Sequence, residues 1–363
     1  MKIQTVLGEI SEDEAGVTLP HEHVFIDLHC YWKDPRDRKS LELAKRKVTI
    51  STLGDLRENP EAIEDNMVVD SVKDVSDELQ IFKTAGGRTI VDATTVGIGR
   101  NPRSLKKAAE KSGVNLVAGC GYYVSLSQPK PIRNWPAGKM TRRIIDDITK
   151  GIDDTGIRAG VIGEIGALND EPDKIEIKSL AAAGRAQEET GAGVVLHTNP
   201  RAVHILLDIL QDNGADLKKV AAAHADSLLS RISTGYPVDG KKERYSTEER
   251  MQHYKDLAGR GVMFAFDGFG VEYWNVSKTS GELYSRPRDI QRVEQIAELV
   301  KEGLVQNILI SQDNCFKSLM TKFGGFGWEH TLKRIVPLLG WAGLSEEEVD
   351  QIIVGNPKKL LAF

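Results

Sequence analysis

Six side chains in the sequence have the chemistry of metal ligands and lie at the edges of apolar, strand-like runs. They are His21, His23, Glu164, His197, His224 and Asp313. A titratable side chain that ends an apolar strand costs free energy unless it is paired or binds a metal. Four imidazoles and two carboxylates suit Zn²⁺, with Mn²⁺ or Co²⁺ as alternatives, rather than calcium or magnesium. Because one tetrahedral zinc takes four ligands, the set predicts two divalent metal ions that share a bridging group and activate a water.

The histidines of the first run, His21 and His23, are separated by one residue. On a strand, residues two apart point to the same face, so both imidazoles are expected on one side and Glu22 on the other. Alone, this pair is also compatible with two polar residues in a loop. The other four candidates each end a separate apolar run, and chance placement of core polar groups explains that pattern poorly.

Strands must position these candidates, and the chain alternates short β-rich runs with amphipathic stretches. The runs cover residues 16–28, 88–96, 114–123, 158–166, 193–198, 219–224, 262–268 and 307–313. The helical patterns cover residues 70–85, 103–112, 141–155, 177–190, 200–212, 246–259, 288–302 and 327–339. The run at 193–196 is apolar throughout, as strands buried on both faces of a parallel sheet are. The alternation predicts an α/β fold, a single (β/α)₈ TIM barrel over residues 1–363.

An open, doubly wound sheet is the alternative to a barrel, but the short stretch 97–100 does not supply its glycine-rich phosphate-binding turn. Four long irregular stretches each follow a predicted strand, at residues 29–69, 124–138, 231–247 and 269–287. Barrel enzymes build their active sites on that side, so these stretches are expected to be extended βα loops. A capping box of Ser345 and Glu348 predicts the start of a closing helix.

Composition and charge limit the classes of function. The 363 residues carry a formal net charge of −5 without a block of Lys or Arg, which argues against a nucleic-acid or anionic-membrane partner. The sequence shows neither a signal peptide nor an apolar run of membrane-spanning length. Three distant cysteines, Cys30, Cys120 and Cys315, do not suggest a disulfide scaffold. We expect a cytoplasmic protein that acts on a small-molecule substrate.

Short motifs accompany the candidate ligands along nearly the whole chain. They are residues 4–8 (QTVLG), 18–23 (TLPHEH), 160–166 (GVIGEIG), 322–327 (KFGGFG) and 356–357 (NP). Together with the strand-end histidines and Asp313, they resemble the phosphotriesterase family of the amidohydrolase superfamily, in particular its phosphotriesterase-related branch. The resemblance implies a metal-dependent hydrolase and a homodimer. By position, it implies that the more buried ion is held by His21, His23 and Asp313, and the more exposed ion by His197 and His224.

Glu164 is implied to bridge the ions, at a position where many family members carry a carboxylated lysine. Glutamate is shorter and needs no carbon dioxide to assemble the site. Asp313 is implied to orient the attacking water and to accept its proton as general base. In several phosphotriesterases a histidine after strand seven relays that proton, whereas residues 264–268 (FAFDG) contain no histidine. This departure weakens the assignment as a true phosphotriesterase.

Three further residues match family positions near the substrate. Tyr123 is implied to line the substrate pocket, although a core aromatic residue would fit equally well. Arg292 could bind a carboxylate, phosphate or sulfonate through its guanidinium fork, with a solvated helix residue as the alternative. Asp226, two residues after His224, matches a recurrent family position, and a surface aspartate at the start of a helix is equally compatible.

The leading expectation is hydrolysis of a small ester, a lactone, including one with an anionic group. The alternatives are an amidohydrolase that acts on an N-acylated small molecule with the same ions, and weak phosphotriesterase activity. A non-catalytic small-molecule binding protein is the alternative of another class, but a pure binder has no need of a buried general base. A structural metal site would be closed and tetrahedral, unlike this ligand set.

Overall fold

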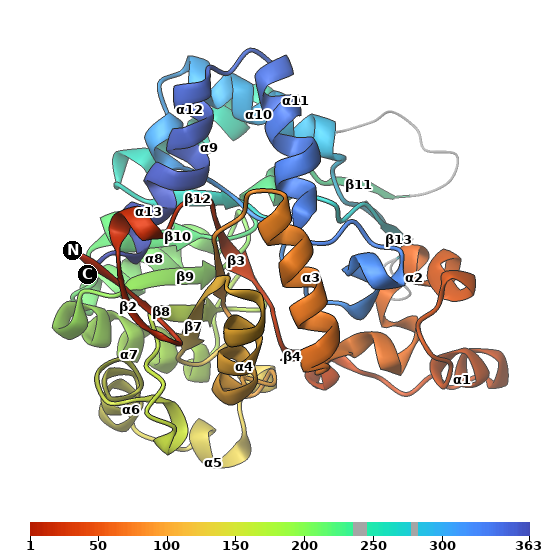
Figure 1. The fold of residues 1–363 in the computed structure, drawn as a ribbon, viewed down its shortest axis with the longest axis horizontal. Coiled ribbons are helices and arrows are strands. Elements are labelled where there is room, and N and C mark those ends of the chain that lie inside the picture. The colour runs from red at the N-terminus through yellow and green to blue at the C-terminus, as the bar shows by residue number, and fades with distance from the viewer. Residues whose placement is uncertain (235–244, 277–281) are drawn as a thin grey trace.

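A ring of parallel strands forms the centre of the protein (Figure 1). The computed structural model describes residues 1–234, 245–276 and 282–363. Neighbouring strands are hydrogen-bonded in the order β15–β12–β10–β9–β8–β7–β6–β3, all in parallel. Their bounds are β3 Thr18–Glu22, β6 Thr89–Asp92, β7 Asn115–Cys120, β8 Val161–Gly166, β9 Gly193–His197, β10 Val220–Ala222, β12 Met263–Phe266 and β15 Ile308–Ile310. Each predicted run contains one of these strands.

The two edge strands, β3 and β15, bring the ring close to closure. They lie next to each other, and the Asp313 backbone N–H donates to the His21 carbonyl at 3.3 Å. The His21 N–H in turn donates to Ser311 Oγ at 3.1 Å. The predicted (β/α)₈ barrel is thereby confirmed.

Helices connect successive strands and surround the ring (Figure 1). They are α3 Val72–Thr84, α4 Pro102–Ser112, α6 Ala137–Thr149, α7 Lys174–Thr190, α8 Val203–Asp212, α9 Thr247–Gly259, α10 Asp289–Lys301, α11 Val336–Trp341, α12 Glu346–Asp350 and α13 Asn356–Leu361. The predicted helix 327–339 differs, because a π-helical turn at Thr331–Ile335 precedes α11. Pro337 lacks the N–H that would continue a regular helical ladder there. The capping box of Ser345 and Glu348 is present at the start of α12.

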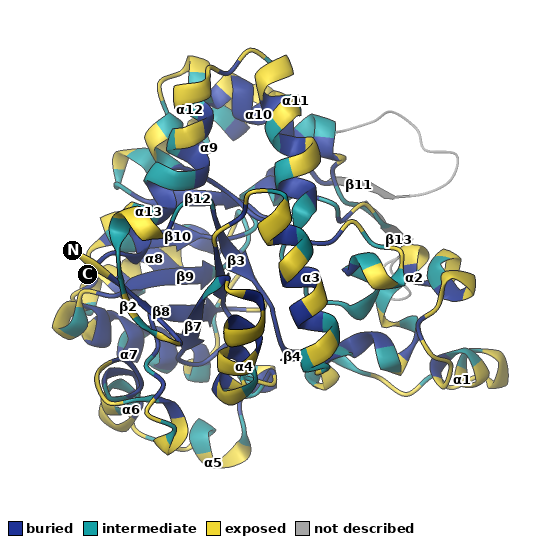
Figure 2. Ribbon diagram, viewed as in Figure 1, coloured by how far each residue is buried: buried dark blue, intermediate teal, exposed yellow. Residues whose placement is uncertain are grey.

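Side chains of the barrel strands alternate between two buried apolar layers. The inner layer contains Val91, Val117, Val161, Val195 and Leu309, and the outer layer, which packs on the helices, contains Ile90, Leu116, Ile162, Val194 and Ile308. The alternation follows from the two-residue period of a strand. Figure 2 shows the result: the strands are buried, and exposed residues gather on the outward faces of the helices.

The long loops contain more regular structure than the sequence predicted. Stretches 29–69 and 124–138, expected to be irregular, hold the helices α1 Arg38–Ala44, α2 Leu53–Glu58 and α5 Lys130–Arg133. Each of these helices is short, so its pattern is weak in the sequence. In the ranges that the structure describes, no helix is long and apolar enough to cross a membrane.

Stretches 231–247 and 269–287 contribute strands rather than only irregular loop. The small antiparallel pairings are β1 Lys2–Thr5 with β2 Gly8–Ser11, β4 Ile26–Asp27 with β5 Val68–Val69, and β11 Arg231–Thr234 and β13 Trp274–Val276 with β14 Glu282–Ser285. The partner of β11, which is β14, is far away in the sequence, and a local pattern therefore did not indicate β11. Residues 235–244 and 277–281 of these two stretches lie outside the described residues.

The amino-terminal ends of the barrel strands are covered by the two ends of the chain. Ile3 of β1 packs in the inner apolar layer together with Leu360 and Leu361 of α13. The Phe363 backbone N–H donates to the Lys2 carbonyl at 3.0 Å, and the N and C labels lie side by side in Figure 1. This floor leaves the carboxyl ends of the strands as the open end of the barrel.

Shortening a buried side chain of this floor should lower the stability of the whole barrel. Leu360 is fully buried, so Leu360→Ala is expected to lower the free energy of unfolding by about 2–5 kcal/mol, measured by urea denaturation. The matched control Leu7→Ala removes a leucine that is 53% exposed and should change it by less than about 0.5 kcal/mol. Equal stability of the two variants would contradict the role of the floor.

Candidate metal centre

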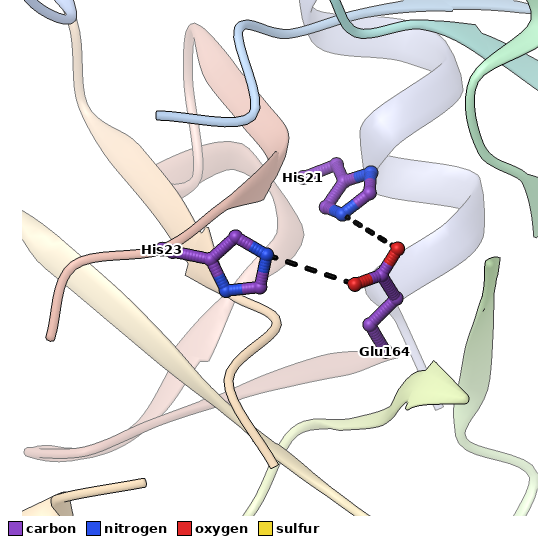
Figure 3. A group of neighbouring side chains, drawn as sticks. All are labelled: His21, His23 and Glu164. Atoms are coloured by element: carbon purple, nitrogen blue, oxygen red, sulfur yellow. Dashed lines mark ion pairs between the residues drawn. The ribbon is translucent and has the colours of Figure 1, made fainter. Parts of the chain in front are cut away.

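Four imidazoles meet one buried carboxylate at the open end of the barrel. Figure 3 shows His21 and His23 directed at the two oxygens of Glu164. His21 Nε2 lies 3.4 Å from Glu164 Oε1, and His23 Nε2 lies 3.7 Å from Oε2. From β9 and the end of β10, His197 Nδ1 and His224 Nε2 lie 2.7 and 3.2 Å from Oε1. Glu164 therefore contacts four imidazoles from three other strands.

Asp313 completes the set that the sequence predicted. Its Oδ1 lies 3.3 Å from His23 Nε2, and its side chain is 20% exposed, so the carboxylate also faces open space. His197 Nδ1 lies 2.9 Å from His224 Nε2 on the other side of the cluster. The structure thus brings all six predicted residues together.

Two bulges turn these side chains into the barrel. In β3, an extra residue interrupts the pairing with β6 between Leu19 and Glu22. Leu19 consequently packs outward, whereas His21, two residues later, faces the cluster. In β8, a similar shift lies between Ile162 and Ile165, and both isoleucines pack outward although they are three positions apart. Because a bulge inserts one residue, it lets the carboxylate between them face inward.

Two members of the cluster have left-handed backbone conformations. His224 has a φ of 58° and Asp313 a φ of 50°. Such conformations are unfavourable for residues other than glycine and persist where the surroundings hold them. The His224 N–H donates to both carboxylate oxygens of Asp267 at 3.0 Å, and the Asp313 N–H donates to the His21 carbonyl. Backbone contacts therefore fix both side chains in direction.

Asp267 was not singled out from the sequence, yet it orients two of the imidazoles. Its Oδ2 lies 2.7 Å from His21 Nδ1, and its Oδ1 lies 3.0 Å from His224 Nδ1. When Nδ1 donates to Asp267, Nε2 of each ring is left as the atom that can bind a cation. The available signal was the position of Asp267 directly after an apolar run, the same signal that identified the ligands.

The carboxylates make this end of the barrel favourable for positive charge. Burial alone would lower the pKa of His23, but contacts with Asp313 and Glu164 raise it to about 9. Burial also disfavours charge on Glu164, yet the imidazoles of His197 and His21 hold the pKa of that carboxyl well below its ordinary value. A divalent cation would supply positive charge at this position.

The spacing of the β3 imidazoles and Glu164 fits the ligands of a divalent ion, whereas the donor atoms of Glu164, His197 and His224 lie closer together, 2.7–3.2 Å apart. Two atoms that each lie 2.0–2.2 Å from a tetrahedral ion are about 3.3–3.6 Å apart, close to the 3.4 and 3.7 Å between the β3 imidazoles and Glu164. His21 Nε2 is buried and has no hydrogen-bond partner among the described residues. Two groups that share Glu164 can hold an ion: His21, His23 and Glu164, and Glu164, His197 and His224. A third group, His21, His224 and Asp267, is explained by the hydrogen bonds to Nδ1.

A cavity of about 230 Å³ lies against the cluster. Its apolar wall is formed by Ile26, Leu28, Ile98 and Phe316. Tyr123 lines it as the sequence predicted, and its hydroxyl lies 3.3 Å from His197 Nδ1. Tyr31, from the loop after β3, donates to the Tyr123 hydroxyl at 3.1 Å. The cavity has room for a small molecule with one end at the cluster.

Arg292, predicted to meet the substrate, instead lies within the protein. It is fully buried, and its guanidinium donates to Asp226 Oδ2 at 2.6 Å and to Asp289 Oδ1 at 3.1 Å. Asp226 is also fully buried, so it is not a surface helix residue. A side chain at Gly268 would approach both Arg292 and Asp226 to 2.5 Å. Among the residues that the structure describes, the arginine that lines the cavity is Arg286, and the sequence could not distinguish it from Arg292.

Known proteins resemble this chain over its full length. The sequence profile of the phosphotriesterase family matches residues 1–234 and 243–361. A protein named N-acetyltaurine hydrolase from Salmo salar is 35% identical, and the alignment covers 100% of this chain and 98% of that protein. The structure of a resiniferatoxin-binding protein from Rhodobacter sphaeroides superposes with a TM-score of 0.89 at 30% identity, covering 99% of this chain and 94% of the other. A lactonase from Listeria monocytogenes has a TM-score of 0.76 at 23% identity, with coverage of 100% and 99%.

Substitution of Asp267 should weaken metal binding without touching a proposed ligand. In Asp267→Asn, one amide oxygen replaces the two acceptors that orient the imidazoles, and we expect the affinity for divalent ions to fall about 10–100-fold. Competition with a chromophoric chelator measures this affinity. Asp208→Asn is the control, because Asp208 is 62% exposed and pairs with a surface arginine. Unchanged affinity in Asp267→Asn would contradict the orienting role.

Proposed function

Because the chain belongs to the phosphotriesterase family of metal-dependent hydrolases, we propose that it hydrolyses a small N-acylated amine that carries a sulfonate or carboxylate. The observation that carries this proposal is the similarity, over the whole length of both chains, to proteins named N-acetyltaurine hydrolase. The lactonase likeness, at 23% identity, supports the fold alone. The amide-hydrolase alternative is therefore preferred to the lactonase that was expected first.

The cavity supports a substrate with this composition. N-acetyltaurine joins a short apolar acyl group to an amine with a sulfonate. The apolar wall of Ile26, Leu28 and Ile98 suits the acyl group. The guanidinium of Arg286 offers a planar set of donors to a sulfonate or carboxylate. At about 230 Å³, the cavity is below the usual size of pockets for drug-sized ligands, which favours a small substrate.

Two divalent ions, for which we propose Zn²⁺, would be held by the six clustered side chains with Glu164 shared between them. When bound, such ions polarise the scissile carbonyl and lower the pKa of water. The imidazole-rich donor set is the basis for proposing zinc. Structural zinc sites are usually closed, whereas the exposed part of Asp313 and the adjoining cavity leave this cluster open to a substrate.

The chain's own residues supply positioning and proton transfer. Asp313 accepts a proton from the water that attacks the carbonyl carbon, and it returns that proton to the amine nitrogen as the C–N bond breaks. The products are a carboxylic acid and an amine. Tyr123, held by Tyr31, lies beside the cluster, where its hydroxyl can orient the carbonyl oxygen. Arg286 holds the anionic end, so the amide bond is presented to Asp313 in one orientation.

A substrate panel with metal analysis tests the proposal. The purified protein should contain two divalent ions per chain, and it should hydrolyse N-acetyltaurine or N-acetylglycine faster than γ-butyrolactone or paraoxon. Removal of the ions with a chelator should abolish turnover, and added Zn²⁺ should restore it. Preference for the lactone would replace the proposal with the lactonase alternative. A ligand-induced rise in melting temperature without any turnover would favour a binding protein.

Replacement of Arg286 should affect anionic substrates selectively. Hydrogen bonds to charged groups contribute about 1.5–3 kcal/mol, so Arg286→Met is expected to lower kcat/KM for N-acetyltaurine roughly 10–100-fold. The control substrate N-ethylacetamide lacks the anion and should lose far less. Arg288→Met is the matched control variant, because Arg288 is exposed and does not line the cavity. Equal losses for both substrates would exclude Arg286 from anion recognition.

A further inference from the structure

We propose that Glu22, between the two histidines of β3, is a positioning residue for Asp313. Its side chain faces away from the barrel axis, as the spacing of the strand predicts, and it is fully buried. It is not a member of any group that can hold an ion among the described residues. A buried carboxylate is unfavourable unless it is paired or well hydrogen-bonded, so the partners of Glu22 show what it does.

Four donors surround the Glu22 carboxylate, two at each oxygen. Oε1 accepts from Ser311 Oγ at 2.6 Å and from the Gln312 backbone N–H at 2.7 Å. Oε2 accepts from the Asn314 backbone N–H at 3.0 Å and from Trp328 Nε1 at 3.1 Å. Three of these donors belong to the short segment 311–314 that follows β15. One side chain therefore binds this segment at several points.

Two of these donors flank Asp313 directly, one residue before it and one after it. Asp313 adopts a left-handed backbone conformation with a φ of 50°, which a non-glycine residue keeps only where neighbouring contacts hold it. Its own N–H donates to the His21 carbonyl at 3.3 Å, a long hydrogen bond. The hydrogen bonds that Glu22 accepts from the Gln312 and Asn314 N–H groups are shorter, at 2.7 and 3.0 Å. These contacts hold the direction in which the Asp313 carboxylate points.

Glu22 also connects β3 to the segment after β15, the two edge strands of the barrel, which meet at a seam without strand pairing. Strand pairings connect the eight barrel strands from β15 round to β3, but no ladder joins β15 to β3 in the described chain. The contacts that cross the seam include those of Glu22 and the hydrogen bond from His21 N–H to Ser311 Oγ at 3.1 Å. Glu22 is the residue before His23, so its hydrogen bonds to segment 311–314 also help to hold Asp313 close to the His23 imidazole. Asp313 Oδ1 lies 3.3 Å from His23 Nε2.

The inference rests on the proposed function in treating Asp313 as the group that moves the proton. A displacement of about 1 Å in a reacting group can lower turnover about 100-fold. Loss of the hydrogen bonds between Glu22 and segment 311–314 should therefore lower kcat. The contacts that bind the ions and the anionic end of the substrate should remain intact. A residue with a merely structural role would lower stability without this selective effect.

Glu22→Gln tests the inference, because the amide group places N–H donors where the carboxylate accepted them. We expect kcat for N-acetyltaurine to fall roughly 10–100-fold, with KM within about threefold of wild type and the metal content unchanged. Hydrogen exchange of segment 311–316, followed by mass spectrometry, should become faster. Should Glu22→Gln fail to fold, Trp328→Phe removes a single donor to Oε2 and should give a smaller fall in kcat and a smaller gain in exchange.

Glu78→Gln is the matched control, since it is the same substitution of a buried glutamate, here in α3, whose carboxylate also binds the loop that follows β15. Glu78 accepts from the Thr321 backbone N–H at 3.1 Å and from its hydroxyl at 2.6 Å, beyond the segment that holds Asp313. It should lower the melting temperature while keeping kcat and the exchange of segment 311–316. A folded Glu22→Gln variant with wild-type kcat and exchange would overturn the inference, and so would a fall in kcat matched by loss of metal.

The exchange measurement separates this inference from the proposed function. If wild-type protein hydrolyses no N-acylated substrate, the proposed function fails. Faster exchange of segment 311–316 in Glu22→Gln, but not in Glu78→Gln, would then still support the positioning of Asp313. If wild type is active and Glu22→Gln leaves both exchange and kcat unchanged, the proposed function stands and the inference fails.

Discussion

The contacts of one buried carboxylate, Glu164, determine the arrangement at the open end of the barrel. A carboxylate without exposure must be surrounded by donors or positive charge, and here four imidazoles lie within 3.7 Å of it. This requirement accounts for features that a regular barrel lacks. The bulge in β8 turns this carboxylate into the barrel. The bulge in β3, the left-handed conformation of His224 and the contact of the His224 N–H with both oxygens of Asp267 turn imidazoles toward it.

The clustered side chains and the wall of the adjoining cavity belong to different parts of the chain. The clustered side chains lie at strand ends, where the barrel holds their directions through backbone contacts. The cavity wall comes largely from the loops, with Tyr31 after β3 and Arg286 before α10. A change of loop sequence can therefore alter which bond is presented to the cluster without rebuilding it.

The cluster was predictable from the sequence because its signal is local: a titratable residue at the end of an apolar run. The same signal marked Asp267. Its role depends on contacts with the imidazoles of His21 and His224, and the sequence did not predict these contacts. Arg292 and Arg286 lie on either side of the start of α10, and only the packing of that helix shows that Arg286 lines the cavity. The strands β11 and β14 pair across about fifty residues of sequence, beyond the reach of local periodicity.

The floor of the barrel has a consequence for biosynthesis. Leu360, Leu361 and Ala362 belong to the same apolar layer as Ile3 and the inward-facing residues of the strands, yet they follow all eight strands in the chain. During translation, the strands and their helices leave the ribosome before the residues that complete their inner layer. Until residues 360–362 have been synthesised, the inner layer lacks part of its apolar cover at this end and therefore cannot be completed there.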